Sequence, residues 1–211
     1  MLRVLLLVWL ISAYPGGWAA ITVEELPDYV VADRPVALTF TVRQHGVTRL
    51  SGLRARIEAR AGDVTAQAMA TPGREPGQYV ASLTLPRPGE WTITIYSGFG
   101  NSRITLLPLL AIAPGAQAPV SPPESERGRR LFVAKGCVTC HVHGDIEGSG
   151  TVAVGPELTG RRWPADYLKL FLANPAIAPQ SGTFRMPDLG LKPQEIAALA
   201  AFLRAERQAL Q

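Results

Sequence analysis

The stretch Cys137-Val138-Thr139-Cys140-His141 is a Cys-x-x-Cys-His motif, and it contains both cysteines of the 211-residue chain. Near the start of a helix, thiols three residues apart project from one face, at a spacing that suits addition to the two vinyl groups of one haem. The histidine that follows presents a neutral imidazole nitrogen to the iron from the same side. This string is a c-type haem attachment signal. We therefore expect one covalent haem c per chain, held by Cys137, Cys140 and His141.

Three other uses of these residues compete with haem binding. A zinc ion would have to recruit Cys137, Cys140, His141 and His143, but zinc sites usually draw their ligands from two separated segments. A dithiol redox centre should start a helix just after a strand of a parallel α/β domain, whereas the flanking residues here read as helix on both sides. A disulfide between cysteines three residues apart forms only with strain.

The first twenty residues read as an export signal. Arg3 supplies a positive charge, residues 4–11 (VLLLVWLI) are apolar, and helix-breaking residues precede Ala19 and Ala20. We expect cleavage after Ala19 and a periplasmic or otherwise extracytoplasmic location. The apolar run is shorter than the roughly twenty residues that span a bilayer, and an uncleaved membrane anchor is the alternative. No cysteine follows the signal, which excludes a bacterial lipoprotein anchor.

The net charge argues against nucleic acid as a partner. The formal charge of +4 divides almost evenly between the two halves of the chain, whereas nucleic-acid binding needs basic residues concentrated on one face. Basic residues of the second half are candidates for docking to a partner, although charged runs are usually solvated faces. They are Arg127, Arg129, Arg130, Lys135, Arg161, Arg162, Lys169, Arg185 and Lys192.

A proline-rich segment, residues 114–123 (PGAQAPVSPP), divides the chain and favours an extended, semi-rigid spacer. Before it, residues 36–42, 79–85 and 91–96 alternate apolar and polar side chains between turn signals, which predicts an antiparallel β-sandwich of about seven strands. Residues 104–113, broken by Pro108, predict a terminal strand that runs into the linker. The expected division is a signal at 1–19, a sandwich at 20–113, a linker at 114–123 and a helical domain at 124–211.

The sandwich resembles one known kind of module. Gly77-Gln78-Tyr79 and Pro88-Gly89-Glu90-Trp91 each introduce a strand, as in the immunoglobulin-like modules of the YtkA and FixH kind found in bacterial envelope proteins. The resemblance implies an immunoglobulin-like fold, and such a domain most simply serves docking or spacing. Copper binding has little support, because His45 and Met69 are the only soft or imidazole ligands of this half and copper sites need several together.

The second half of the chain reads as helices. A first helix covers residues 125–134, with Ser125 as a candidate N-cap, and a last, amphipathic helix covers residues 192–203. Gly128 and Phe132 lie on one face of the first helix. Because a glycine permits close approach, we expect the two helices to cross at Gly128.

Two further segments lie between these helices. Residues 164–173 (PADYLKLFLA) predict a helix with proline in its first turn that ends before Asn174-Pro175. Residues 142–154 are rich in glycine and predict a flexible loop.

The order of motifs over about residues 124–211 resembles class I c-type cytochromes, which implies an all-α cytochrome c fold behind the β-sandwich. Met186-Pro187 stands where the family has its methionine ligand, and Met186 is also the one thioether of this half. His143 is the rival sixth ligand, with a solvent-facing or propionate-contacting position as the alternative. The motifs that carry the resemblance are Gly128 and Phe132, residues 136–141 (GCVTCH), Gly155-Pro156-Glu157-Leu158, Met186-Pro187 and an alanine-rich helix over residues 193–207.

The resemblance also implies a role for each site residue. Cys137 and Cys140 would carry thioether bonds, and His141 would be the proximal ligand, with the Pro156 carbonyl on its other ring nitrogen. Met186 would be the sixth ligand, a pairing that raises the reduction potential in cytochromes c. Arg161, Arg162 and Trp163 stand at positions whose residues often contact the haem propionates in this family.

Six-coordinate iron has no open position for a substrate, so one-electron transfer is the expected chemistry. The expected role is a carrier, or the haem module of a respiratory or oxidative complex at the membrane, which exchanges electrons with redox partner proteins. A haem enzyme subunit, for example in sulfur-compound oxidation, and an envelope metal-handling or sensing module are the alternatives. With three histidines and no second Cys-x-x-Cys-His motif, a dihaem peroxidase is excluded.

Overall fold

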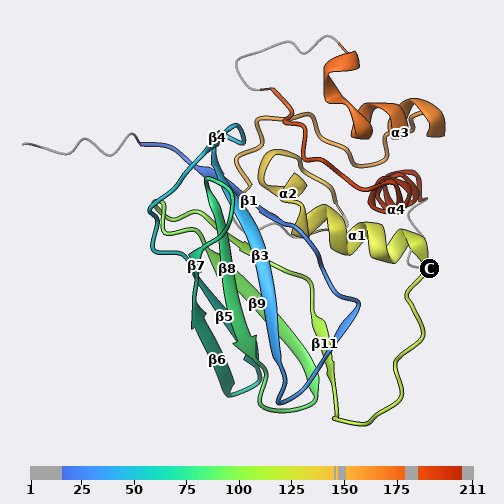
Figure 1. Ribbon diagram of the computed structural model, residues 1–211. Coiled ribbons are helices and arrows are strands. Elements are labelled where there is room, and N and C mark those ends of the chain that lie inside the picture. The colour runs from blue at the N-terminus through green and yellow to red at the C-terminus, as the bar shows by residue number, and fades with distance from the viewer. Residues whose placement is uncertain (1–15, 145, 147–150, 179–184, 206–211) are drawn as a thin grey trace, which may run out of the picture.

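The computed structural model describes residues 16–144, 146, 151–178 and 185–205. A β-sandwich is followed by a helical domain that lies across one end of it (Figure 1). Most of the expected export signal, residues 1–15, lies outside the described residues. The two-domain fold class expected from the sequence is confirmed.

The sandwich consists of two sheets. Neighbouring strands are antiparallel except β2 and β11, which are parallel. The first sheet has the order β1 (Ala19–Val23), β3 (Pro35–Gln44), β8 (Gln78–Thr84) and β7 (Thr71–Pro72), with β4 (Thr48–Arg49) also on β3. The second sheet has the order β2 (Tyr29–Val31), β11 (Leu109–Ile112), β9 (Gly89–Tyr96), β5 (Arg56–Ala61) and β6 (Val64–Met69), with β10 (Arg103–Thr105) also on β9.

The alternating segments of the sequence form the core of the sandwich. Alternate side chains of β3, β8 and β9, including Phe40, Tyr79 and Trp91, are buried, as expected for strands with one face on the core. The expected count of about seven strands omitted several short ones. The single terminal strand expected over residues 104–113 is instead two strands, β10 and β11. Pro108 separates them, because proline has no N–H to donate to a strand ladder.

Four α-helices and one short 3-10 helix follow in the described residues. They are α1 (Glu124–Ala134), α2 (Cys137–Cys140), α3 (Ala165–Ala173), η1 (Pro175–Ile177) and α4 (Pro193–Arg204). Ser125 is not the N-cap of α1, because the helix begins one residue earlier and Pro123 occupies that position. The predicted helix over 164–173 is confirmed as α3, with Pro164 immediately before its first residue.

Helices α1 and α4 cross at Gly128, as predicted. A Cβ at Gly128 would lie only 1.9 Å from the carbonyl oxygen of Ala198, so only glycine lets the two backbones meet there. Beside the crossing, the rings of Phe132 and Phe202 lie 5.6 Å apart between centroids. Helix α2, which contains the two cysteines, follows α1 directly, so the packing of α1 against α4 positions it.

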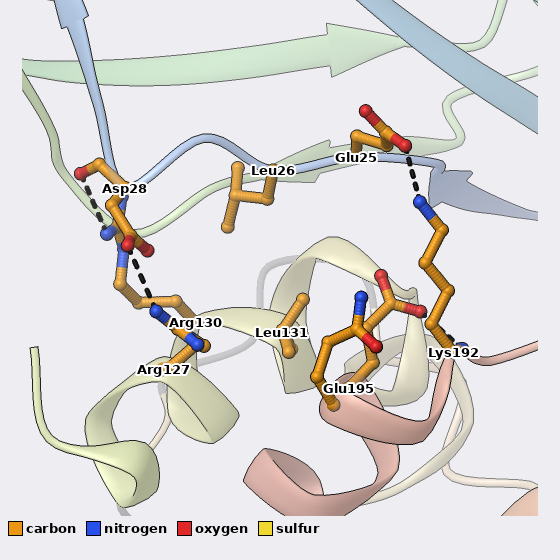
Figure 2. Close-up of a pocket in the computed structure, with 9 residues that line it drawn as sticks. Glu25, Leu26, Asp28, Arg127, Arg130, Leu131, Lys192 and Glu195 are labelled. Atoms are coloured by element: carbon orange, nitrogen blue, oxygen red, sulfur yellow. Dashed lines mark hydrogen bonds and ion pairs between the residues drawn. The ribbon is translucent and has the colours of Figure 1, made fainter. Parts of the chain in front are cut away.

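The connection between β1 and β2, residues 24–28 (EELPD), lies against α1 and α4. Figure 2 shows Glu25 paired with Lys192, and Asp28 bound to Arg127 and Arg130. Arg127 Nη2 lies 3.2 Å from a carboxylate oxygen of Asp28, and Arg130 Nη1 donates to the Asp28 carbonyl at 3.1 Å. We call residues 24–28 the acidic connection.

Lys135 joins the acidic connection to both helices from a buried position. Its Nζ donates to the Glu24 carbonyl at 2.7 Å and lies 2.7 Å from a carboxylate oxygen of Glu195 on α4. Both side chains of this ion pair are almost fully buried. The sequence had suggested Lys135, with Arg127, Arg130 and Lys192, as candidates for partner docking, but all four face the sandwich.

In the part of the chain that the structure describes, no helix has the length and apolar character needed to cross a bilayer.

Candidate functional site

Gly136 sets the direction of the motif as the chain leaves α1. It adopts a left-handed conformation with φ of +79°, which glycine populates without steric cost. A Cβ at this position would also lie 2.5 Å from the carbonyl oxygen of Ile21 in β1. The turn into α2 therefore depends on glycine for two reasons, its backbone conformation and its contact with the sandwich.

Cys137 and Cys140 lie at the two ends of α2, a single helical turn, and both thiols are free. Burial is the main cause that raises the pKa of Cys137 to about 12 and the pKa of Cys140 to about 11. A redox-active dithiol needs a lowered thiol pKa. The geometry and electrostatics therefore disfavour a dithiol redox centre and leave two neutral thiols on one turn.

The ring of His141 is held from one side. Its Nδ1 donates a hydrogen bond to the Pro156 carbonyl at 2.9 Å. Because the carbonyl can only accept, the neutral ring carries its proton on Nδ1 and keeps a lone pair on Nε2. Burial lowers the pKa of His141, and the hydrogen bond to Pro156 opposes that shift in part. The result is an oriented, neutral imidazole with one nitrogen suited to a metal.

Gly155 lets the backbone approach this ring. A Cβ there would lie 2.5 Å from Cε1 of His141, closer than any side chain can pack. Two backbone bonds hold the segment in place: the N–H of Gly155 donates to Cys140 at 2.9 Å, and the N–H of Leu158 donates to Val142 at 2.9 Å. The Gly-Pro pair is recognisable in the sequence as a motif, but that pattern assigns no role to Gly155. Because Gly155 has no Cβ, the backbone can come close enough for the Pro156 carbonyl to reach His141.

His143 does not face solvent, which was one of the alternatives expected for it. It is buried, and its ring centroid lies 4.5 Å from that of Phe202 and 5.8 Å from that of Phe132. Its ring thus packs against the aromatic side chains beside the crossing of α1 and α4. Packing of this kind disfavours both the zinc site and an axial role for His143.

The remaining candidates lie on two segments. Arg161 and Arg162 are exposed and precede α3, while Trp163 is half-buried against the core. Met186 is half-buried and also packs against the core, on the segment that leads into α4. The structure thus joins Cys137, Cys140, His141 and Pro156 through one helical turn and the contact between the His141 ring and the Pro156 carbonyl. It places Trp163 and Met186 against the core, and it leaves Arg161 and Arg162 exposed.

Two further expectations concern residues outside the Cys137–His141 motif and its contacts. Part of the expected loop over 142–154, namely 145 and 147–150, lies outside the described residues. The two copper candidates of the sandwich have different surroundings: Met69 is exposed on β6, and His45 packs against Trp18. Among the described residues, no group of three or more His, Cys, Asp or Glu side chains is arranged to hold a metal ion.

The motif residues fit a covalently bound haem. Two unpaired thiols on one helical turn can form two thioether bonds, and the oriented imidazole can ligate iron. Gly155 and Pro156 form a close-fitting support behind that imidazole.

Comparison with known proteins agrees with this fit. Residues 125–206 match the family model described as cytochrome c. No curated protein matches the chain significantly. Solved structures similar to part of the chain include the Lin-41 filamin domain, at 18% identity and a TM-score of 0.35 over 45% of this chain and 90% of that one. A superoxide reductase (neelaredoxin) from Ignicoccus hospitalis matches at 15% identity and a TM-score of 0.29, over 44% of this chain and 79% of that one. Structural similarity this low does not assign the sandwich to a family. Its resemblance to modules of the YtkA and FixH kind therefore stays a prediction.

Proposed function

Because residues 125–206 form a cytochrome c domain that carries haem c, we propose that the protein is an exported monohaem cytochrome that transfers single electrons. It serves as a periplasmic carrier or as the haem module of a respiratory or oxidative complex, with redox proteins as its partners. The observation that carries the proposal is the His141 ring, fixed by Pro156 beside two free thiols. Such a site suits a permanently bound, tuned iron centre rather than a substrate pocket.

Each residue of the site has a stated task. Cys137 and Cys140 would hold the haem by thioether bonds, each formed by addition of S–H across one vinyl group, and His141 would ligate through Nε2. The bound haem supplies the one-electron change between Fe(III) and Fe(II). The Nδ1–H bond to Pro156 orients the imidazole and makes it a stronger donor. Met186 is proposed as the sixth ligand, which raises the potential relative to bis-histidine ligation.

Haem extraction tests the covalent attachment. Acid–acetone treatment of the purified protein should leave the haem on the polypeptide, and one haem per chain should be found by pyridine haemochrome assay. Replacing both cysteines, Cys137→Ala and Cys140→Ala, should abolish attachment. Haem that extracts from the native protein would overturn the proposal.

The sixth ligand is tested by Met186→Ala, with Met69→Ala as the control because Met69 is an exposed methionine of the sandwich. Only the first substitution should remove the sulfur-to-iron charge-transfer band, lower the potential and let cyanide bind the ferric iron. An unchanged spectrum in Met186→Ala would assign the sixth position to another residue.

The location is tested by fractionation together with mass spectrometry of the mature N-terminus. Ala19 is the first residue of β1, and its N–H donates to Ser102 Oγ at 2.9 Å, while Trp18 packs on His45. Cleavage after Ala19, as expected from the sequence, would remove both Trp18 and Ala19. An N-terminus upstream of Trp18 would retain these contacts, and recovery in the cytoplasmic fraction would contradict export.

A further inference from the structure

The segment that carries Met186 lies along the sandwich. At one end, a Cβ at Gly46, in the turn between β3 and β4, would lie 3.9 Å from Cγ of Pro187 and 3.8 Å from Cη2 of Trp18. Gly46 has φ of +77° and follows His45, whose φ of 52° is also left-handed. This tight turn thus brings the backbone of Gly46, which has no side chain and is buried, close to the ring of the residue after Met186.

The same segment stays beside the sandwich as it continues. Leu189 and Gly190 line a cavity of about 370 Å³ together with Thr22 of β1 and Arg43 of β3. At the far end, Lys192 pairs with Glu25 of the acidic connection. Residues 187–192 therefore lie against the sandwich at both ends, and between these ends they share a cavity with β1 and β3.

Strand β1 also contacts the other side of the haem site. The Ile21 carbonyl fills the space beside Gly136, and Thr22 Oγ1 donates to the Lys135 carbonyl at 3.4 Å. The β1–β3 register pairs Ala19 with Gln44, next to the turn that holds Pro187. Strands β1 and β3, together with the turn after β3, thus lie beside the backbone before Cys137 and beside the ring of the residue after Met186.

We propose that the first sheet of the sandwich positions the sixth ligand. The turn at Gly46 fixes Pro187, and β1 fixes Gly136, so the sheet sets the distance between the Met186 segment and the Cys137–His141 motif. Gly46 and Pro187 are positioning residues, which act on the iron through Met186. This inference rests on the proposed ligation by Met186, and it gives the sandwich a role in the redox site itself rather than in spacing alone.

The test compares Gly46→Leu with Gly62→Leu in the full-length haem protein. Both glycines lie in sandwich turns at left-handed φ, +77° and +59°, so both substitutions strain the backbone. Only the leucine at position 46 would press on Pro187, and it would press on Trp18 as well. Gly46→Leu should weaken the sulfur-to-iron band, lower the potential and strengthen cyanide binding at least tenfold, whereas Gly62→Leu should leave all three unchanged.

Rescue identifies the route of the effect. Pro187→Ala removes the ring atoms nearest Gly46, so adding it to Gly46→Leu should restore part of the band. Pro187→Ala alone introduces no clash and should fold, yet the band should be lost at a lower temperature than global unfolding by circular dichroism. This variant keeps the test decisive even if Gly46→Leu does not fold.

Two outcomes separate this inference from the proposed function. If Met186→Ala alters the spectrum while Gly46→Leu and Pro187→Ala do not, Met186 is the ligand and the sandwich does not position it. If Met186→Ala leaves the spectrum unchanged, the proposed ligation fails, and the positioning role fails with it.

Discussion

Gly128→Ala should destabilise the protein even though alanine is the better helix former. In an exposed helix interior this substitution is favourable by about 1 kcal/mol. At Gly128, however, the new methyl carbon would lie 1.9 Å from the Ala198 carbonyl oxygen and 2.8 Å from Cβ of Phe202. Carbon and oxygen atoms approach to about 3.3 Å at closest. Helices α1 and α4 would have to separate locally by roughly 1.4 Å, the difference between 3.3 and 1.9 Å.

That separation outweighs the gain in helix propensity. Overpacking a core costs about 1–3 kcal/mol, and a clash with backbone belongs at the upper end of that range. The aromatic packing beside the crossing would loosen as well, since a gap of even 0.5–1 Å forfeits about a quarter to a half of a dispersion contact. Subtracting the propensity gain leaves a net loss of about 2 kcal/mol. For a chain of this size, the melting temperature should fall by about 4–8 °C.

The measurement is urea or thermal unfolding of the haem-loaded protein, followed by far-ultraviolet circular dichroism. Lys169→Ala, on the exposed face of α3, is the control and should stay within about 0.5 kcal/mol of the native protein. A Gly128→Ala variant as stable as the native protein would refute the close crossing of α1 and α4.

Three further changes test the site and the domain interface. Gly155→Ala places a methyl group against the His141 ring and should push it away from the Pro156 carbonyl. The reduction potential of the haem should then rise, because the imidazole loses the hydrogen bond that makes it a stronger donor to iron. An unchanged reduction potential in a potentiometric titration would contradict this. Lys135→Met leaves the Glu195 carboxylate buried without its cation and should cost about 3–5 kcal/mol in urea unfolding, part of which Glu195→Gln should recover in the double variant. Residues 124–211 alone, with an export signal, should still bind haem covalently, because the thiols and His141 lie within them, but with a weakened sulfur-to-iron band; failure to attach haem would show that attachment itself needs the sandwich.

The features that sequence reasoning predicted correctly are those whose physical cause is local. The spacing of Cys137 and Cys140 is a property of one helical turn. The close approach at Gly128 follows from a glycine on an apolar helix face, where any other residue would hold the partner helix away. The end of α3 before Asn174-Pro175 follows from the conformational limits that proline imposes on its neighbour.

The features that it missed depend on contacts between distant segments. Lys135 and Glu24 are 111 residues apart in the sequence, and nothing near Lys135 distinguishes it from a solvated lysine. A solvent-facing position was one expected alternative for His143, but two phenylalanines from different helices pack against its ring. In both cases the surroundings of a polar residue depend on which distant segments meet in three dimensions.

Lys135 shows how the two domains depend on each other. Its side chain binds a carbonyl of the acidic connection and a carboxylate of α4, and its own carbonyl accepts from Thr22 of β1. A buried ammonium group is tolerated only while its partners remain in place. Separating the sandwich from the helices would remove the Glu24 carbonyl from Lys135 and leave it the ion pair with Glu195 of α4. The buried apolar side chains of both domains also form one continuous cluster. Loss of the interface should therefore disturb the turn at Gly136, one residue after Lys135, before it disturbs either distant end of the molecule.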